Sequence, residues 1–314
     1  MDKKYLFKKG KHGYKANLHC HTVVSDGTRT PEEIKKIYRD SGYSVVAFTD
    51  HNKLIPQTQL NDDSFLAINS VEFDINDEEH KNGSHSIRTY HFNLYAERCD
   101  MTETPPPPRM KYADIGAINA YIAERTAEGY LVCYNHPYWS LQDASEYCRL
   151  KGLFAMEIYN HSCETGGHYG YHPQAYDEML RAGDMLYCVS ADDNHDRHDP
   201  NGPMWDSCGG YVVINAESLT YENIIAALKN GNFYASQGPE IYGITLEDKK
   251  LSVECSPAQL INVYTDGRRC YPAYGDGMTG AAFELSGNER YIRVMCRDKN
   301  YKDANSNAYL TGFR

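Results

Sequence analysis

Long apolar runs and a secretion signal are both missing from this sequence of 314 residues. No stretch comes near the roughly 18 consecutive apolar residues that a membrane-spanning helix requires. The basic N-terminal segment has neither a long apolar core nor a small-residue cleavage site, so it does not resemble a secretory signal. We therefore expect a cytoplasmic protein without a membrane partner.

The ten cysteines lack any recognisable spacing. They are scattered along the chain, and no two of them form a C-x-x-C pair. This distribution supports neither a zinc finger nor a disulfide framework. We expect reduced thiols, which are the usual state of cysteine in the cytosol.

Positive charge is in deficit. The chain has 32 lysines and arginines against 43 aspartates and glutamates, which gives a net charge of −11 with neutral histidines. Such an acidic chain is a poor general binder of phosphate backbones, so we expect no nucleic-acid polymer as partner. A small anionic substrate is still allowed, because bound metal ions can reverse the local field.

Apolar runs alternate with helical patterns through about residue 237. The clearest helix start is Thr30–Glu33, with Thr30 as N-cap, Pro31 at the first helical position and Glu33 completing a capping box. The pattern predicts strands at 15–20, 44–48, 65–73, 87–95, 130–134, 154–159, 185–190 and 211–214, and helices at 31–40, 111–128, 174–182 and 220–229. This order favours an α/β fold with a parallel sheet.

The pattern changes after Gly238-Pro239. From there the sequence shows no helical periodicity, and it predicts strands at 241–246, 251–255, 260–265 and 291–297 with turns between them. We therefore expect two domains, an α/β domain at 1–237 and a small all-β unit at 238–314.

Two histidines at the end of the first strand begin a series of residues that can bind metal. His19 and His21 point to the same side of a strand, because side chains alternate with a period of two. The pair alone is a weak signal in a chain with 13 histidines. It is strengthened by imidazoles and carboxylates near the ends of later strands, the full set being His19, His21, Asp26, His51, Glu72, His91, His136, Asp193 and His195.

These nine residues can hold more than one metal ion. A single-metal site needs three or four protein ligands, so nine are enough for two or three ions. In a closed parallel barrel, the strand C-terminal ends form the rim on which active sites are built. Imidazole with carboxylate suits zinc, iron or manganese. The ordinary alternatives are a turn role for Asp26, a buried ion pair for Glu72, and loop or capping roles for the histidines.

The set resembles the polymerase and histidinol phosphatase (PHP) family of metallohydrolases over about residues 10–235. The matching blocks occur in the family's order, as LHCHTVVSDGTRTPEE (Leu18–Glu33), FTDHN (Phe48–Asn52), Val71-Glu72, HFNLY (His91–Tyr95), NHPYW (Asn135–Trp139) and SADDNH (Ser190–His195). The later part is also similar to the carbamate-hydrolase-related branch of that family, through Met156–His161, Tyr176–Ala182 and Ala235–Pro239. The resemblance implies a distorted seven-stranded (β/α) TIM-like barrel with a metal cluster at its rim, followed by a small β unit.

The resemblance also implies how the ligands divide among two or three divalent transition metals. One ion would take His19, His21, Glu72 and Asp193; a second would share Glu72 and take His91 and His136; a third would take Asp26, His51 and His195. Many family members have histidine where Asp26 stands, so the third site is the one expected to differ. We interpret Asp193 as the ligand and its neighbour Asp192 as a supporting residue, because the D-x-H spacing of Asp193 matches the family.

The expected function is hydrolysis of a small phosphate ester through a metal-bridging hydroxide, with His195 and Asp193 in catalytic roles. His161, Arg197 and Lys53 are the predicted substrate-binding residues. Two alternatives remain, an amide or carbamate hydrolase and a non-catalytic metal-binding module. A basic substrate pocket would favour phosphate, whereas an apolar, tyrosine-lined pocket would favour an amide or carbamate.

Overall fold

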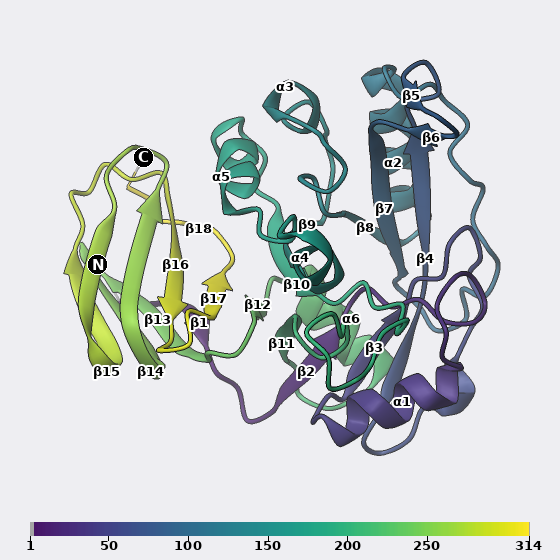
Figure 1. The fold of residues 1–314 in the computed structure, drawn as a ribbon. Coiled ribbons are helices and arrows are strands. Elements are labelled where there is room, and N and C mark those ends of the chain that lie inside the picture. The colour runs from purple at the N-terminus through teal and green to yellow at the C-terminus, as the bar shows by residue number, and fades with distance from the viewer. Residues whose placement is uncertain (1–2, 314) are drawn as a thin grey trace.

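The computed structural model describes residues 3–313 and shows a mixed α/β protein (Figure 1). Its strands are β1 (Lys4–Lys8), β2 (Gly13–Asn17), β3 (Val45–Phe48), β4 (Leu66–Asn76), β5 (Lys81–Asn82), β6 (His85–Ser86), β7 (Thr89–Ala96), β8 (Tyr130–Tyr134), β9 (Ala155–Asn160), β10 (Tyr187–Ala191), β11 (Tyr211–Asn215), β12 (Phe233–Ser236), β13 (Ile241–Glu247), β14 (Lys250–Thr265), β15 (Tyr271–Glu284), β16 (Tyr291–Arg297), β17 (Asp303–Ser306) and β18 (Tyr309–Leu310). Its helices are α1 (Pro31–Asp40), the 3₁₀ turn η1 (Thr58–Leu60), α2 (Ile115–Ala127), α3 (Ala144–Tyr147), α4 (His161–Gly167), α5 (Pro173–Arg181) and α6 (Tyr221–Lys229).

Sixteen of the strands form one sheet, and its strands run in both directions. β2, β3 and β4 are parallel to one another, and so are β8, β9 and β10. β7 is antiparallel to both of its neighbours, β4 and β8, so the prediction of a parallel sheet is wrong there. The connection explains the reversal, because residues 77–88 hold only the small β5–β6 hairpin and no crossover helix.

The two ends of the run from β2 to β10 meet just beyond the strands. Cys20 forms a parallel bridge with Asn194. The backbone N–H of Asp193 donates to the carbonyl oxygen of His19 at 2.9 Å, and that of His21 donates to Asn194 at 3.1 Å. These bonds bring residues 19–21 and 193–194 together, although 172 or more positions separate them in the sequence. The predicted seven-stranded barrel remains a prediction.

One buried cluster draws side chains from all seven strands of this run. Its members from these strands and their ends are Ala16, Leu18, Val45, Ala47, Leu66, Ile68, Tyr95, Leu131, Cys133, Ala155 and Val189. Burial of this apolar surface is the main favourable term in forming the layer that lies beneath the predicted ligands. Helix α1 begins as predicted, with Thr30 accepting from the Glu33 backbone and Glu33 accepting from the Thr30 backbone. None of the described helices combines the length and the apolar character needed to cross a membrane.

The C-terminal part consists of strands and turns throughout residues 239–313 (Figure 1). β14 is one 16-residue strand where the sequence predicted two. The sequence pattern missed β15, because this strand is mostly exposed and carries glycines in place of alternating apolar residues. β1 pairs with β13, so the N-terminal strand lies among the C-terminal ones. The division at residue 237 remains a prediction.

A buried arginine on a C-terminal strand forms an ion pair with helix α5. Arg293 on β16 is 1% exposed. Its Nε and Nη2 atoms donate to both carboxylate oxygens of Asp177 on α5, at 2.6 and 2.7 Å. Its guanidinium also lies 4.0 Å from the ring centre of Tyr264. Because this charge is removed from water, it depends on the carboxylate of Asp177 for compensation.

We predict that Arg293→Ala lowers the free energy of unfolding by about 3 kcal/mol, because it removes one partner of a buried ion pair. Arg293→Lys should recover only part of this loss, since an ammonium cannot form the two-pronged contact. Urea unfolding followed by circular dichroism measures both values, with exposed Arg268→Ala as the control. A loss for Arg293→Ala no larger than that of Arg268→Ala would contradict the role of this pair.

Candidate metal centre

All nine predicted ligands meet at one end of the sheet. Most of them border a cavity of about 580 Å³. His19, His21 and Asp26 follow β2, His51 follows β3, His136 follows β8, and Asp193 and His195 follow β10. Glu72 lies within β4, and His91 lies near the start of β7. Because β7 runs backwards, its first residues reach the same end of the sheet as the last residues of the parallel strands.

The first group of donor atoms is almost completely buried, with only Asp193 slightly exposed, at 10% of its side chain. The Nε2 atoms of His19 and His21 are 3.1 Å apart. Asp193 Oδ1 lies 3.1 Å from the first and 3.0 Å from the second. Glu72 completes the group, with Oε1 at 3.3 Å from His19 and Oε2 at 3.4 Å from His21. Two imidazole nitrogens and two carboxylates that converge in this way match the ligand types of zinc, iron or manganese.

The second group shares a carboxylate oxygen of Glu72, Oε1, with the first group. Glu72 Oε1 lies 2.9 Å from His91 Nδ1 and 3.6 Å from His136 Nε2. It also accepts a hydrogen bond from the side-chain amide of Asn135 at 2.8 Å. His136 Nε2 is 3.8 Å from Asp193 Oδ2. Glu72 and Asp193 therefore both stand between the first and second groups.

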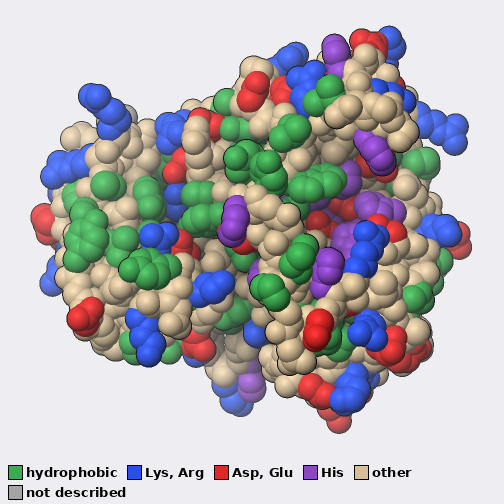
Figure 2. All heavy atoms as spheres, in the orientation of Figure 1, with side chains coloured by type: hydrophobic (Ala, Val, Ile, Leu, Met, Phe, Trp, Pro, Cys, Tyr) green, Lys and Arg blue, Asp and Glu red, His purple; other side chains and the backbone are tan. Residues whose placement is uncertain are grey.

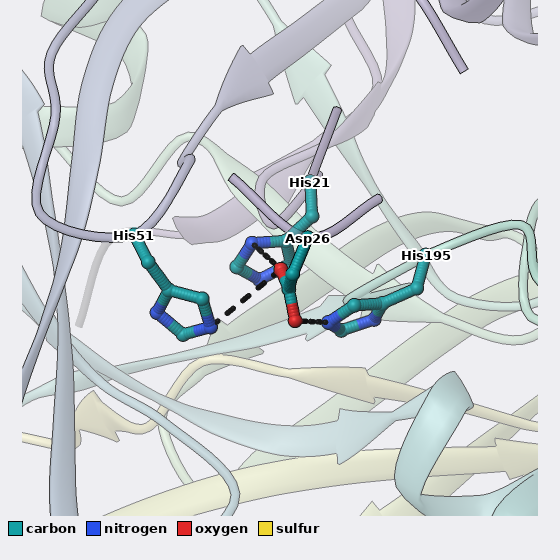
Figure 3. A group of neighbouring side chains, drawn as sticks. All are labelled: His21, Asp26, His51 and His195. Carbon is teal, nitrogen blue, oxygen red and sulfur yellow. Dashed lines mark ion pairs between the residues drawn. The ribbon is translucent and has the colours of Figure 1, made fainter. Parts of the chain in front are cut away.

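The third group is more open and centres on Asp26 (Figure 3). Asp26 lies 3.3 Å from His195 Nε2, 3.6 Å from His21 Nδ1 and 3.9 Å from His51 Nε2. The Asp26 side chain is 41% exposed, and it already accepts a 2.8 Å bond from Arg197. Any cation that binds here must compete with that guanidinium, so this group should have the weakest metal affinity of the three.

Imidazoles and carboxylates in the buried groups stabilise one another's charges. Burial opposes the charge of His19, but Asp193, Glu72 and Glu157 outweigh it and raise its pKa well above the ordinary value. Burial also lowers the pKa of His21, but hydrogen bonds to Asp193 and Glu72 outweigh this effect and raise that pKa to about 10. The neighbouring histidines lower the pKa of Glu72 and Asp193, although burial works the other way. A metal ion must displace the imidazole protons, so metal affinity should rise with pH.

Glu157 on β9 is a buried residue of the centre that the sequence analysis missed. Its Oε1 accepts from His19 Nδ1 at 2.7 Å, which leaves His19 Nε2 facing the first group. Its Oε2 accepts from the His136 backbone at 3.0 Å and from the Asn160 amide at 2.9 Å. A carboxylate behind a histidine fixes the tautomer and orientation of a metal ligand. The available signal was an acid inside the apolar run AMEIYN.

Asp192 faces away from the three groups. Its carboxylate accepts hydrogen bonds from the backbones of Cys208, Gly209 and Gly210 and from the hydroxyl of Tyr38. Burial raises the pKa of Asp192 to about 7, although these hydrogen bonds act in the opposite direction. Asp193, and not Asp192, therefore lies beside the other predicted ligands, and the ligand role of Asp193 stays a prediction.

Of the three predicted substrate-binding residues, only Arg197 lines the cavity. Lys53 is exposed and is not among the lining side chains. His161 is not among them either, and its Nδ1 contacts the Tyr159 hydroxyl at 2.8 Å. Burial lowers the pKa of His161 to about 4, which makes it a neutral group at physiological pH. The geometry therefore gives no support for Lys53 or His161 as direct substrate contacts.

The cavity wall also contains residues that the sequence analysis did not predict as substrate contacts. They are Trp139, Leu141, Ser162, Cys163, Thr165, Gly166, Tyr169, His198, Met204 and Asp206. They come from helix α4 and from loops far apart in the chain, so no local motif signals their convergence.

Among known proteins, matches were found only to solved structures, 13 chains in all, three of which are described below. No family model matches the chain, and no curated protein matches it. A two-domain protein from Bacteroides vulgatus, named as containing a predicted PHP-like metal-dependent phosphoesterase, is similar at 15% identity, with 98% of this chain and 97% of that chain covered and a TM-score of 0.47. A proposed metal-dependent phosphoesterase from Bifidobacterium adolescentis has 15% identity, coverages of 62% and 92% and a TM-score of 0.41. An amidohydrolase from Chromobacterium violaceum with bound sulfate and no metal has 14% identity, coverages of 57% and 87% and a TM-score of 0.38.

We predict that Glu72→Gln removes more metal than Asp26→Asn. Glu72 contacts the donor atoms of two groups, whereas Asp26 belongs only to the exposed third group. After dialysis against trace metal, elemental analysis should find that Glu72→Gln has lost most of the wild-type metal and that Asp26→Asn has kept most of it. Equal retention by the two variants would contradict this assignment.

We predict that Glu157→Gln weakens metal binding by about 10- to 100-fold without unfolding the chain, because a neutral amide stabilises the His19 orientation less than a carboxylate. Competition titration with a metal-sensitive dye measures this change. Glu124→Gln is the control, since the Glu124 side chain is 68% exposed on α2. Wild-type affinity in Glu157→Gln would show that the buried carboxylate has no orienting role.

Proposed function

We propose that the chain is a metal-dependent hydrolase that cleaves a small phosphate ester. The observation that carries this proposal is the position of Glu72, whose carboxylate lies within 3.6 Å of ring nitrogens from both groups: those of His19 and His21 and those of His91 and His136. One carboxylate shared by two ligand groups is suited to hold two ions side by side. Divalent ions bound there would supply activation of water at neutral pH and neutralisation of phosphate charge.

We further propose that the run from β2 to β10 is the distorted seven-stranded barrel that the PHP resemblance implies. The hydrogen bonds between residues 19–21 and 193–194 support closure of this run at the metal-binding end. The shared apolar cluster supports a filled interior, as in other barrels with eight or fewer strands. In this arrangement the ligands stand on the rim formed by the strand ends.

Arg197 is the proposed phosphate contact. It is the one lysine or arginine among the residues that line the cavity, and its side chain is 52% exposed. Its Nη2 donates to Asp26, which fixes the guanidinium beside the third group. A planar guanidinium with free N–H donors can bind phosphate oxygens in pairs.

His195 is the proposed proton donor to the leaving oxygen. Its Nδ1 lies 2.9 Å from the carbonyl oxygen of Asp193, and because a carbonyl can only accept, Nδ1 carries the hydrogen. Nε2 is therefore the atom that either binds a metal or takes a second proton. In a chain with two ions in the first two groups, Nε2 can hold that proton beside the carboxylate of Asp26, 3.3 Å away. In this proposal Asp193 serves as a metal ligand, and its backbone carbonyl orients the ring of His195.

Hydrolysis of an amide or carbamate is the second candidate. The apolar side chains Trp139, Leu141, Tyr169 and Met204 line the cavity beside the single arginine, so its wall is less basic than a pocket built only for phosphate. The same activated water can attack a carbonyl carbon. A cytoplasmic location and a small phosphorylated substrate remain part of the first proposal.

A panel of phosphomonoesters, phosphodiesters and aryl carbamates, assayed after reconstitution with zinc, iron or manganese, tests this proposal. We expect phosphate release from at least one monoester, loss of turnover with a chelator, recovery on adding metal back, and background turnover in Glu72→Gln. Turnover of carbamates alone would favour the second candidate. No turnover of any substrate by a metal-replete chain would contradict a hydrolase.

A further inference from the structure

One wall of the cavity is apolar, and its side chains are unusually exposed. Of 13 large hydrophobic side chains that are exposed in the described part of the chain, four line this one cavity. They are Tyr169, Met204, Trp139 and Leu141, with exposed fractions of 39%, 42%, 47% and 51%. Figure 2 shows hydrophobic side chains bordering the hollow in which the histidines and carboxylates gather. Exposed apolar side chains gathered around one cavity indicate a binding surface, whereas isolated ones do not.

This wall adjoins the metal ligands directly. The ring centre of Trp139 is 5.0 Å from that of His136 and 5.7 Å from that of His91, both in edge-on geometry. A group that packs on Trp139 therefore lies next to the second ligand group. The ring of Tyr169, another member of the wall, packs edge-on against that of Tyr138, with the ring centres 4.7 Å apart.

The backbone holds the wall in position. Trp139 and Leu141 lie in a turn at residues 136–142 that three backbone hydrogen bonds close. The N–H groups of Ser140, Leu141 and Gln142 donate to the carbonyl oxygens of His136, Tyr138 and Pro137, at 3.1, 3.0 and 3.1 Å. Leu141 has a φ of +54°, a left-handed conformation that a bulky residue adopts only at an energetic cost. The turn thus keeps an exposed leucine in a strained conformation, which is a feature of ligand sites.

The rest of the cavity has the opposite character. Arg197, His198 and Asp206 provide charged or polar groups in the same cavity. A ligand that satisfies both parts has a polar, reacting end at the metal groups and an uncharged, flat end at Trp139. The volume of about 580 Å³ lies in the range of pockets that hold a ligand with a ring rather than a bare phosphate.

We propose that the apolar wall is a subsite for an aromatic ring of the substrate, attached to the ester or amide that is cleaved. The inference rests on the proposed hydrolase activity at the same cavity and adds the class of substrate. Trp139 and Tyr169 provide ring surfaces for edge-on or offset contact, and Leu141 and Met204 complete the apolar surroundings. Trp139 is the residue of the subsite that should determine specificity, because its ring contacts the ligands His91 and His136.

Calorimetric binding of three probes to the zinc-loaded full chain tests this subsite. Phenylphosphonate carries both the anion and the ring, methylphosphonate carries only the anion, and benzamide carries the ring with a neutral amide in place of the anion. We expect phenylphosphonate to bind wild type about tenfold tighter than methylphosphonate, because its ring is buried against the wall. Trp139→Ala should reduce that ratio to about twofold and leave methylphosphonate affinity unchanged, while Trp139→Phe keeps most of the ratio.

Tyr274→Ala is the matched control, since Tyr274 is an aromatic residue with 76% exposure on β15. It should keep the wild-type ratio. Equal affinity for the two phosphonates in wild type would overturn the subsite, and so would a ratio that survives Trp139→Ala. If Trp139→Ala does not fold, Tyr169→Ala and Met204→Ala replace it, with the same expected loss of the ratio.

The probes also separate the subsite from the phosphate proposal. Binding of benzamide that Trp139→Ala abolishes, with no binding of either phosphonate, would support the subsite and contradict phosphate as the substrate group. Turnover of alkyl phosphates without any preference for aryl phosphates or aryl carbamates would support hydrolysis and overturn the subsite.

Discussion

The buried carboxylate of Glu72 is the constraint on which the rest of the site depends. Glu72 is 1% exposed, and a charge at such a position needs compensation from groups that are themselves held in place. Five imidazoles supply it, at distances between 2.9 and 3.6 Å, from His19, His21, His51, His91 and His136. These residues follow or belong to four different strands. The ends of those strands must therefore meet around β4, and the same convergence that stabilises the carboxylate produces a metal-binding cluster.

Backbone geometry brings the remaining parts of the site to this carboxylate. Bonds between residues 19–21 and 193–194 place Asp193 opposite His19, and the reversed direction of β7 brings His91 to the same end of the sheet. Glu157 then fixes His19 from behind. The third group differs, because Asp26 is partly exposed and already paired with Arg197. The cluster thus combines two buried groups that share ligands with one open group beside the substrate cavity.

Local patterns predicted much of this arrangement. The capping box of α1 and the ligand types at strand ends depend on neighbouring residues, and the structure brings all nine predicted ligands together. The predicted direction of β7 was wrong, because hydrophobic periodicity identifies a strand but not the strand it pairs with. The sequence analysis missed β15, because this strand lacks alternating apolar residues. It also missed the role of Glu157, because the hydrogen-bond partner of Glu157, His19, lies 138 positions away in the sequence. The apolar wall joins Leu141, Tyr169 and Met204 from separate loops, and only tertiary packing shows their proximity.

Anomalous diffraction from crystals of the chain reconstituted with zinc tests the central claim most directly, because it locates each ion independently of activity. The account predicts two strong peaks, one beside His19 and His21 and one beside His91 and His136, both in contact with the carboxylate of Glu72, and a weaker or absent peak at Asp26. A structure with saturating zinc and no peak at Glu72, in which this carboxylate stays paired only with histidines, would contradict the account.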